Sequence, residues 1–200
     1  MNKNRIEAFS DGVLAIIITI MVLELKVPQH SASFQTLLAI FPVFISYVLS
    51  FIYIGIYWNN HHHLMQSMKE VDGKIMWANL HLLFWLSLIP FATGWMGENQ
   101  FAKATMTLYG VILLLAAVAY QILQNLIISR QGVNSILQKA IQKDFKGKSS
   151  PVLYLLAIGF SFYNEWIAGL IYIAVAMMWL IPDRRIEKKV AEVTSKNESE

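Results

Sequence analysis

Residues 5–25 read RIEAFSDGVLAIIITIMVLEL, and this stretch decides how the rest of the chain is interpreted. It opens with a charged, aromatic and polar cluster: Arg5, Phe9, Ser10 and Asp11. An apolar run from Val13 to Leu23 follows, and only Thr19 interrupts it. An acidic group at the start of an apolar helix is costly in a bilayer, so it normally faces a bundle interior or a water-filled path. The alternative is that Ser10 or Asp11 simply caps a buried helix.

The composition is typical of an integral membrane protein. Of 200 residues, 56% are hydrophobic and only 14% are charged, with a mean hydropathy of +0.48. An ordinary soluble domain carries about 25% charged residues. The net charge is +3 and the charges lie at segment ends, which suits topology signals better than a nucleic-acid surface. We therefore expect the lipid bilayer as a partner and no nucleic acid. The absence of cysteine excludes disulfides and thiolate metal sites.

Hydropathy predicts an all-α membrane domain over residues 1–183 with six transmembrane helices. The expected spans are about 8–25, 36–58, 74–96, 104–128, 150–163 and 166–181. The second to fourth are long enough to cross a hydrocarbon core of roughly 30 Å. The last two are short, and Asn164 and Glu165 separate them, so they form either one broken span or a tight hairpin. The first could instead be a cleaved signal peptide, but Asp11, Glu24 and Lys26 do not suit one.

The distribution of basic residues decides the topology. With six spans and an inner N-terminus, only Lys26 and Lys103 of the 16 lysines and arginines fall outside. This positive-inside bias favours the hairpin and predicts a multi-pass plasma-membrane protein with both termini in the cytoplasm. Residues 129–149 are expected to form a cytoplasmic amphipathic helix on the anionic leaflet. Residues 184–200 are expected to be a charged cytoplasmic tail.

Polar residues gather at the expected inner ends of the second and third spans. Three consecutive histidines, 61–63, cannot share one helical face because neighbours lie about 100° apart. We expect His62 or its neighbours to meet Ser10 and Asp11 at the same depth, together with Asn79 and His81. Pro90 is expected to kink the third span. The plainer alternatives are an interfacial polar helix end and a kink that serves packing alone.

No motif indicates an enzyme, a cofactor or a bound metal. The chain has no nucleophile elbow, no phosphate-binding glycine loop and no paired intramembrane carboxylates. The midplane of the first span offers only Thr19, which favours a passive conduit. The alternative is a proton- or cation-coupled carrier that uses Asp11 with His62 or His81.

The spacing Arg5-x-x-x-Phe9-Ser10-Asp11 resembles the signature of the transmembrane protein 175 family of potassium channels. The Trp58–His62 segment and the run from Asn79 to Phe91 also resemble that family. The resemblance implies a homotetramer of six-span subunits around a central pore that the first helix lines, with K⁺ as the permeating ion. It also implies no TVGYG-type filter, and none is present in the sequence.

The resemblance further implies where the pore lies. Family pore positions fall on Ile16, Ile20 and Leu23, and the threonine used by some bacterial members falls on Thr19. Their spacing places all four on one helical stripe, although the same stripe could pack on another helix. Four isoleucines in a ring can close a pore by excluding water. Arg5, Ser10 and Asp11 are implied to link the inner ends of neighbouring helices.

Overall fold

The computed structural model describes residues 3–27, 33–68, 70–131 and 145–180, and every regular element within them is an α-helix. The all-α prediction is therefore confirmed for the described chain. The helices are α1 (Lys3–Leu23), α2 (Phe34–Ala39), α3 (Phe41–Ser67), α4 (Gly73–Ser87), α5 (Ile89–Glu98), α6 (Lys103–Gln131), α8 (Phe145–Ser161) and α9 (Glu165–Leu180).

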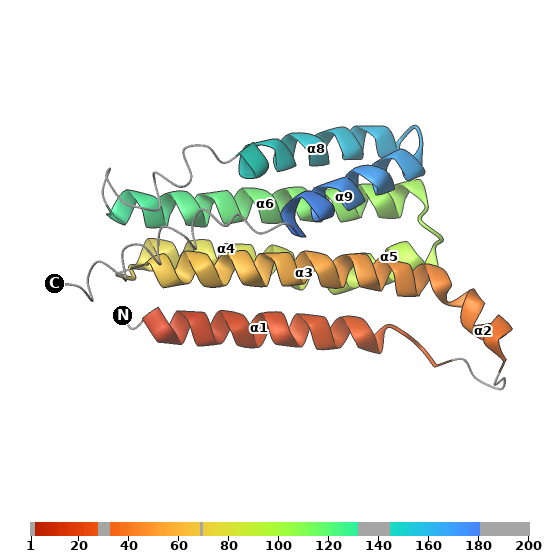
Figure 1. Ribbon diagram of the computed structural model, residues 1–200, viewed down its shortest axis with the longest axis horizontal. Helices are drawn as coiled ribbons and strands as arrows, with labels where there is room; N and C mark the ends of the chain where they lie inside the picture. The colour runs from red at the N-terminus through yellow and green to blue at the C-terminus, as the bar shows by residue number, and fades with distance from the viewer. Residues whose placement is uncertain (1–2, 28–32, 69, 132–144, 181–200) are drawn as a thin grey trace, which may run out of the picture.

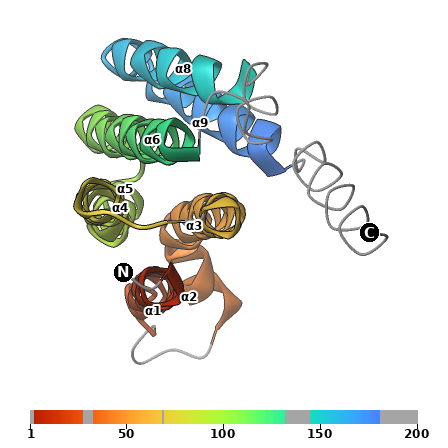
Figure 2. The ribbon, with the colours of Figure 1, turned by 90° about the vertical axis from the view of Figure 1, so that its left-hand side faces the viewer.

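The long helices run side by side along one axis, and α1 forms one edge of the bundle (Figure 1; Figure 2). Helix α1 packs on α3, α4 and α5, while α6 packs on α4, α5 and α8. Helices α8 and α9 lie at the opposite edge (Figure 2). One face of α1 is consequently covered by the bundle, and the other faces away from it.

Four continuous or nearly continuous helical segments are long and apolar enough to cross a membrane: Lys3–Leu23, Phe41–Ser67, Gly73–Glu98 and Lys103–Arg130. The last two helices are shorter, with 17 residues in α8 and 16 in α9. At 1.5 Å per residue each is about 25 Å long. They form an antiparallel hairpin rather than one broken helix (Figure 1), and the backbone N–H groups of Tyr163 and Asn164 close its turn on the Phe160 carbonyl.

Two helix breaks occur at prolines. The segment expected at 36–58 divides at Ile40, and α3 then begins with Pro42 in its first turn. The segment expected at 74–96 divides at Leu88, with Pro90 in the first turn of α5, as the predicted kink requires. Proline has no N–H to donate and restricts the residue before it, so a helix begins more readily at proline than it continues through it.

The remaining boundaries differ modestly from the predicted ones. Helix α1 begins at Lys3 rather than near residue 8, and α3 continues to Ser67 rather than ending near residue 58. Of the amphipathic segment expected at 129–149, residues 132–144 lie outside the described chain, and residues 145–149 belong to α8. The tail expected at 184–200 also lies outside it.

Buried tyrosines join α3, α6 and α9. The Tyr53 hydroxyl donates to the Tyr172 carbonyl at 2.6 Å, and the Tyr172 hydroxyl donates to the Met106 carbonyl at 2.9 Å. Tyr109 shares a 3.0 Å hydrogen bond with Ser50. Gly110 lets the Tyr172 ring approach α6, since a Cβ there would lie 2.1 Å from the Tyr172 hydroxyl oxygen. These bonds satisfy polar atoms that would be costly if left unpaired in an apolar interior.

Candidate functional site

Helix α1 has two distinct faces although its sequence is apolar almost all round. Five buried residues recur at intervals of three or four and face the bundle: Ile6, Ser10, Leu14, Ile17 and Met21. The stripe of Ile16, Thr19, Ile20 and Leu23 is exposed, with Ile16 at 58% and Leu23 at 75%. The packing of α1 on its own bundle therefore shows which face is left exposed. The periodicity of apolar residues in the sequence could not show this.

The Thr19 hydroxyl is oriented by its own helix. Thr19 Oγ1 donates to the Ile16 carbonyl at 2.8 Å. A hydroxyl oxygen has two acceptor lone pairs besides its proton. Because the proton is used within α1, the lone pairs of this exposed oxygen remain available to an outside donor or cation.

A buried polar chain joins three helices near the N-terminal end of α1. The Asn79 side-chain amide on α4 donates to Ser10 Oγ at 2.9 Å, and Ser10 Oγ donates to the Ile6 carbonyl at 2.8 Å. Asn79 Oδ1 lies 2.7 Å from His61 Nε2 on α3, and because that oxygen only accepts, His61 is the donor. Ser10, His61 and Asn79 are each at most 2% exposed. We define these three side chains as the inner polar chain.

A second set of contacts joins α1 to α3 at the same end. Trp58 Nε1 donates to Asp11 at 3.1 Å, and His62 Nδ1 lies 3.0 Å from the Glu7 carboxylate. The Gln66 amide lies 2.8 Å from His62 Nε2, and Lys3 Nζ donates to the Gln66 carbonyl at 2.9 Å. The pattern fits a His62 that donates from Nδ1 and accepts at Nε2.

The structure brings together some of the predicted site residues and separates others. Ser10 and Asn79 meet in the inner polar chain, while Asp11 and His62 contact residues across the α1–α3 interface. His81 does not join them: it is exposed on α4, and its Nε2 accepts from Trp85 of the same helix at 2.9 Å. The reason is geometric, because His81 lies two residues and therefore about 200° from Asn79 around the helix.

Arg5 and Phe9 are exposed near the N-terminal end of α1. They line a hollow of about 310 Å³ between α1 and α4, together with Ile6, Met76, Asn79 and Leu80. No ion pair of Arg5 is found among the described residues.

Sequence reasoning missed Glu7. Trp58 stood only in the segment that resembles the family, and His61 was expected only as one of the neighbours of His62. His61 had a usable signal, because it continues a buried stripe of α3 whose members lie three or four positions apart: Ser46, Ser50, Tyr53, Tyr57 and His61. The signal is weak because the residues between them are equally apolar. The choice between His61 and His62 as the buried histidine needs the packing of α3 on α4.

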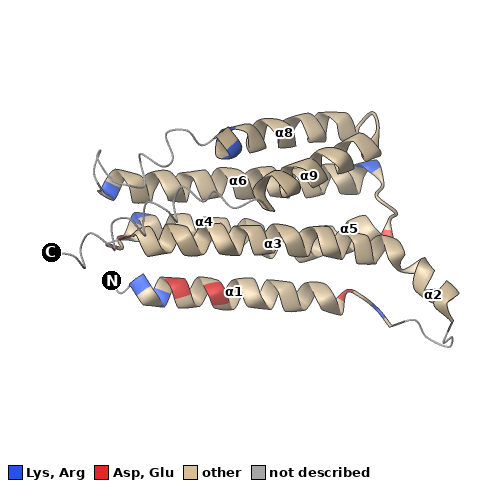
Figure 3. Cartoon of the chain, in the orientation of Figure 1, with Lys and Arg blue, Asp and Glu red and all other residues tan. Residues whose placement is uncertain are grey.

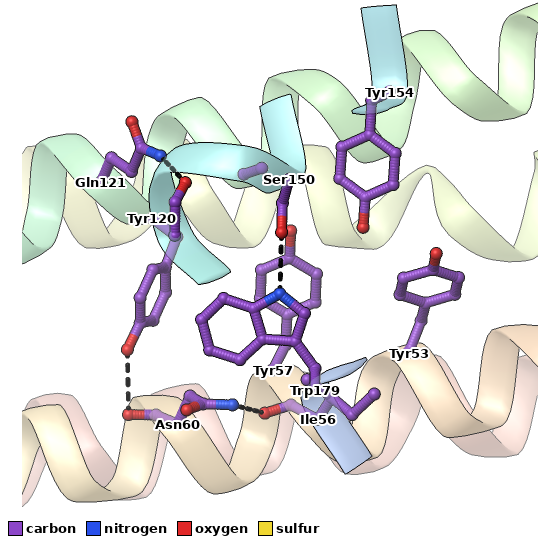
Figure 4. A pocket seen from close by; sticks show the side chains of 11 residues that line it. Tyr53, Ile56, Tyr57, Asn60, Tyr120, Gln121, Ser150, Tyr154 and Trp179 are labelled. Atoms are coloured by element: carbon purple, nitrogen blue, oxygen red, sulfur yellow. Dashed lines mark hydrogen bonds between the residues drawn. The ribbon is translucent and has the colours of Figure 1, made fainter. Parts of the chain in front are cut away.

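A separate cavity of about 40 Å³ lies between α3, α6, α8 and α9 (Figure 4). Its walls are aromatic: Tyr53, Tyr57, Tyr120, Tyr154 and Trp179. Trp179 Nε1 donates to Ser150 at 2.8 Å, and Tyr120 donates to the Asn60 carbonyl at 3.2 Å. No residue of α1 lines this cavity, so it is distinct from the exposed stripe. No cluster of metal-ligating side chains occurs in the described part of the chain.

Together these features define an all-helical, multi-pass membrane protein whose first helix presents a free apolar face. The family model described as "Endosomal/lysosomal potassium channel TMEM175" matches residues 5–90. A potassium channel of Chryseobacterium sp. (strain P1-3) is 57% identical over 192 residues, which cover 96% of this chain and 100% of that relative. The chain belongs to the TMEM175 family.

More distant relatives extend the comparison. A crystal structure titled as a lysosomal potassium-selective channel TMEM175 homolog from Chamaesiphon minutus has a TM-score of 0.78 and 30% sequence identity, covering 90% of this chain and 96% of that chain. The endosomal/lysosomal proton channel TMEM175 of Homo sapiens is 32% identical over 103 residues, which cover 46% of this chain but only 20% of the human protein.

Proposed function

We propose that this chain is a potassium-selective channel whose pore is lined by α1 and repeated around a central axis by four copies. The bacterial relatives that are named potassium channels support this activity, and the exposed stripe supports the position of the pore. The constriction is hydrophobic and lies on Ile16, Ile20 and Leu23, with no TVGYG filter. No cofactor is required, and K⁺ is only in transit.

The observation that carries the proposal is the division of α1 into a packed and a free face. The buried face ties α1 to its own subunit, so the stripe of Ile16, Thr19, Ile20 and Leu23 is left for an axis or a neighbouring copy. Around a four-fold axis, each isoleucine becomes a ring of sec-butyl groups that excludes water. β-Branched side chains have few χ1 rotamers, so opening must come from movement of the helices.

Selectivity is assigned to Thr19. Its exposed hydroxyl oxygen keeps its lone pairs because the proton is donated to the Ile16 carbonyl. Four such oxygens can replace part of the water around a dehydrated cation, and potassium loses its water at a lower cost than sodium. The ring therefore favours potassium.

The proposed location is the plasma membrane, with six spans and both termini in the cytoplasm. The described lysines and arginines gather at the end of the bundle where α1 begins (Figure 3). Lys3 and Arg5 are in the first turn of α1, Lys74 is in the first turn of α4 and Arg130 is in the last turn of α6. Lys146 and Lys148 begin α8, which starts further along the bundle axis (Figure 3). Lys26 follows the end of α1, and Lys103 begins α6. This distribution supports an inner N-terminus, and it requires α8 and α9 to cross as a short pair of spans.

The carrier alternative has less support. It requires proton exchange between Asp11 and His62 or His81, but these side chains hydrogen-bond or pair with Trp58, Glu7 and Trp85 respectively. A carrier would also show flux that saturates and depends on a pH gradient.

The test is conductance in planar bilayers containing the purified protein. Ile16→Asn places amides in the narrow ring and wets it, so we expect a several-fold higher potassium conductance. Ile173→Asn is the matched control, because Ile173 is 48% exposed on α9, away from α1. An unchanged conductance in Ile16→Asn would remove the stripe from the ion path. Native mass spectrometry of the intact complex tests the tetramer separately, because a tetramer has the mass of four chains.

A further inference from the structure

A surface groove of about 720 Å³ lies between the beginning of α4 and the end of α6, and no residue of α1 lines it. The groove has a polar end and an apolar end. Lys74 and Arg130 lie at the polar end, and Trp77, Ile122 and Leu126 provide the apolar wall. Trp77 is 75% exposed and Ile122 is 40% exposed, so the wall is open to whatever surrounds the helices.

Asp72 holds the two sides of the groove together. Its Oδ1 accepts from the Ile75 backbone N–H at 2.9 Å, which caps α4, and its Oδ2 pairs with the Arg130 guanidinium on α6. One carboxylate therefore fixes the helix start and positions Arg130, while it balances a single positive charge. The other guanidinium N–H groups of Arg130 remain able to donate.

The polar end keeps one positive charge that the protein does not balance. Among the described residues, no acidic side chain forms an ion pair with Lys74. The Trp77 indole N–H likewise has no hydrogen-bond acceptor within the described chain. The groove thus offers two cationic donors, one free N–H and a net charge of one, next to an apolar wall.

We propose that this groove binds a glycerophospholipid whose headgroup carries one net negative charge. The phosphate lies between Lys74 and Arg130, and an acyl chain lies along Ile122 and Leu126. Charge complementarity favours this occupant, because a single phosphodiester balances the residual positive charge of the groove. A zwitterionic headgroup carries its own cation and has no net charge to balance it. Basic pockets between helices at a membrane surface bind anionic headgroups in this way. Tryptophan at the same level suits the interface between headgroups and chains.

The test is lipid retention by the purified full-length protein, measured by native mass spectrometry. The probes are dioleoyl phosphatidylglycerol and dioleoyl phosphatidylcholine, added in equal amounts to the detergent-solubilised protein. We expect preferential retention of phosphatidylglycerol. Lys74→Gln should reduce that retention about fivefold, since a lysine near an anionic surface contributes about 1 kcal/mol. Lys74→Arg should restore it.

Lys148→Gln is the matched control, because Lys148 is an exposed lysine near the beginning of α8 that does not line the groove. It should leave the retained lipid unchanged. Equal losses in the two glutamine variants would indicate a general surface-charge effect and overturn the proposal. Equal retention of both lipids by the unmodified protein would also overturn it. The measurement does not require conduction, so its outcome is independent of the proposed channel function.

Discussion

Asn79 uses both ends of one side-chain amide to connect α4 with α1 and α3. It donates to Ser10 and accepts from His61, and all three side chains are buried. The bonds pair the Asn79 amide, the Ser10 hydroxyl and His61 Nε2, while His61 Nδ1 is buried without a hydrogen-bond partner among the described residues. The link therefore holds the N-terminal part of α1 against α3 and α4.

Asn79→Leu should lower the thermal stability of the protein in detergent. The substitution keeps a similar size but leaves the His61 Nε2–H without an acceptor, at a cost of about 1–3 kcal/mol for a buried unsatisfied group. Ser10 loses one bond and keeps its bond to the Ile6 carbonyl. His81→Leu is the control, because His81 is exposed on the same helix. Unfolding followed by tryptophan fluorescence should separate the two variants. Equal melting temperatures would contradict the role of Asn79.

Thr19→Val should lower the preference for potassium over sodium. Valine has nearly the same volume and branching as threonine, so assembly should persist while the hydroxyl oxygen is lost. Reversal potentials under bi-ionic conditions measure the preference. An unchanged reversal potential would exclude Thr19 from the filter and leave the hydrophobic rings as the only constriction.

At the scale of the helix, α4 depends on Asp72 for its beginning. The hydrogen bond from the Ile75 backbone N–H is the main cause that lowers the pKa of Asp72 below its ordinary value, and Arg130 contributes in the same direction. A lowered pKa in the folded state means that the ionised carboxylate stabilises the fold. This contribution is present above the pKa of the unfolded chain and is lost as the pH falls through the lower folded value.

Asp72→Asn should therefore lower the melting temperature at neutral pH and flatten its decline in acid. Asparagine still offers an oxygen to cap α4, but it cannot pair as an anion with Arg130. Melting temperatures between about pH 6 and pH 3 cover the range in which a carboxyl titrates. Glu70→Gln is the control, because it removes a negative charge from the same segment between α3 and α4. A variant with the same acid profile as the unmodified protein would show that Asp72 does not contribute to the decline.

At the scale of the whole molecule, the proposed six-span topology depends on the α8–α9 hairpin crossing the membrane. The chain contains no cysteine, so a single introduced cysteine is the only thiol of the protein that a maleimide can label. Tyr163→Cys, at the 81% exposed hairpin turn, should react with an impermeant maleimide in intact cells. Lys148→Cys should react only after permeabilisation. Labelling of both from the same side would mean that α8 does not cross the membrane.

The sequence by itself determined the class of protein, the positions of the apolar helices and the break at Pro90. It also determined that Ser10, Asp11 and Asn79 lie near the same end of the bundle. These properties follow from composition, local backbone chemistry and distance along a helix, which require no tertiary contact. The family resemblance added the stripe of Ile16, Thr19, Ile20 and Leu23. Only the tertiary structure decided which side of α1 is free, that His61 rather than His62 is buried against Asn79, and that His81 lies apart. The physical reason is that lipid-facing and protein-facing surfaces are both apolar in a membrane, so hydrophobic periodicity does not distinguish them until the helices pack.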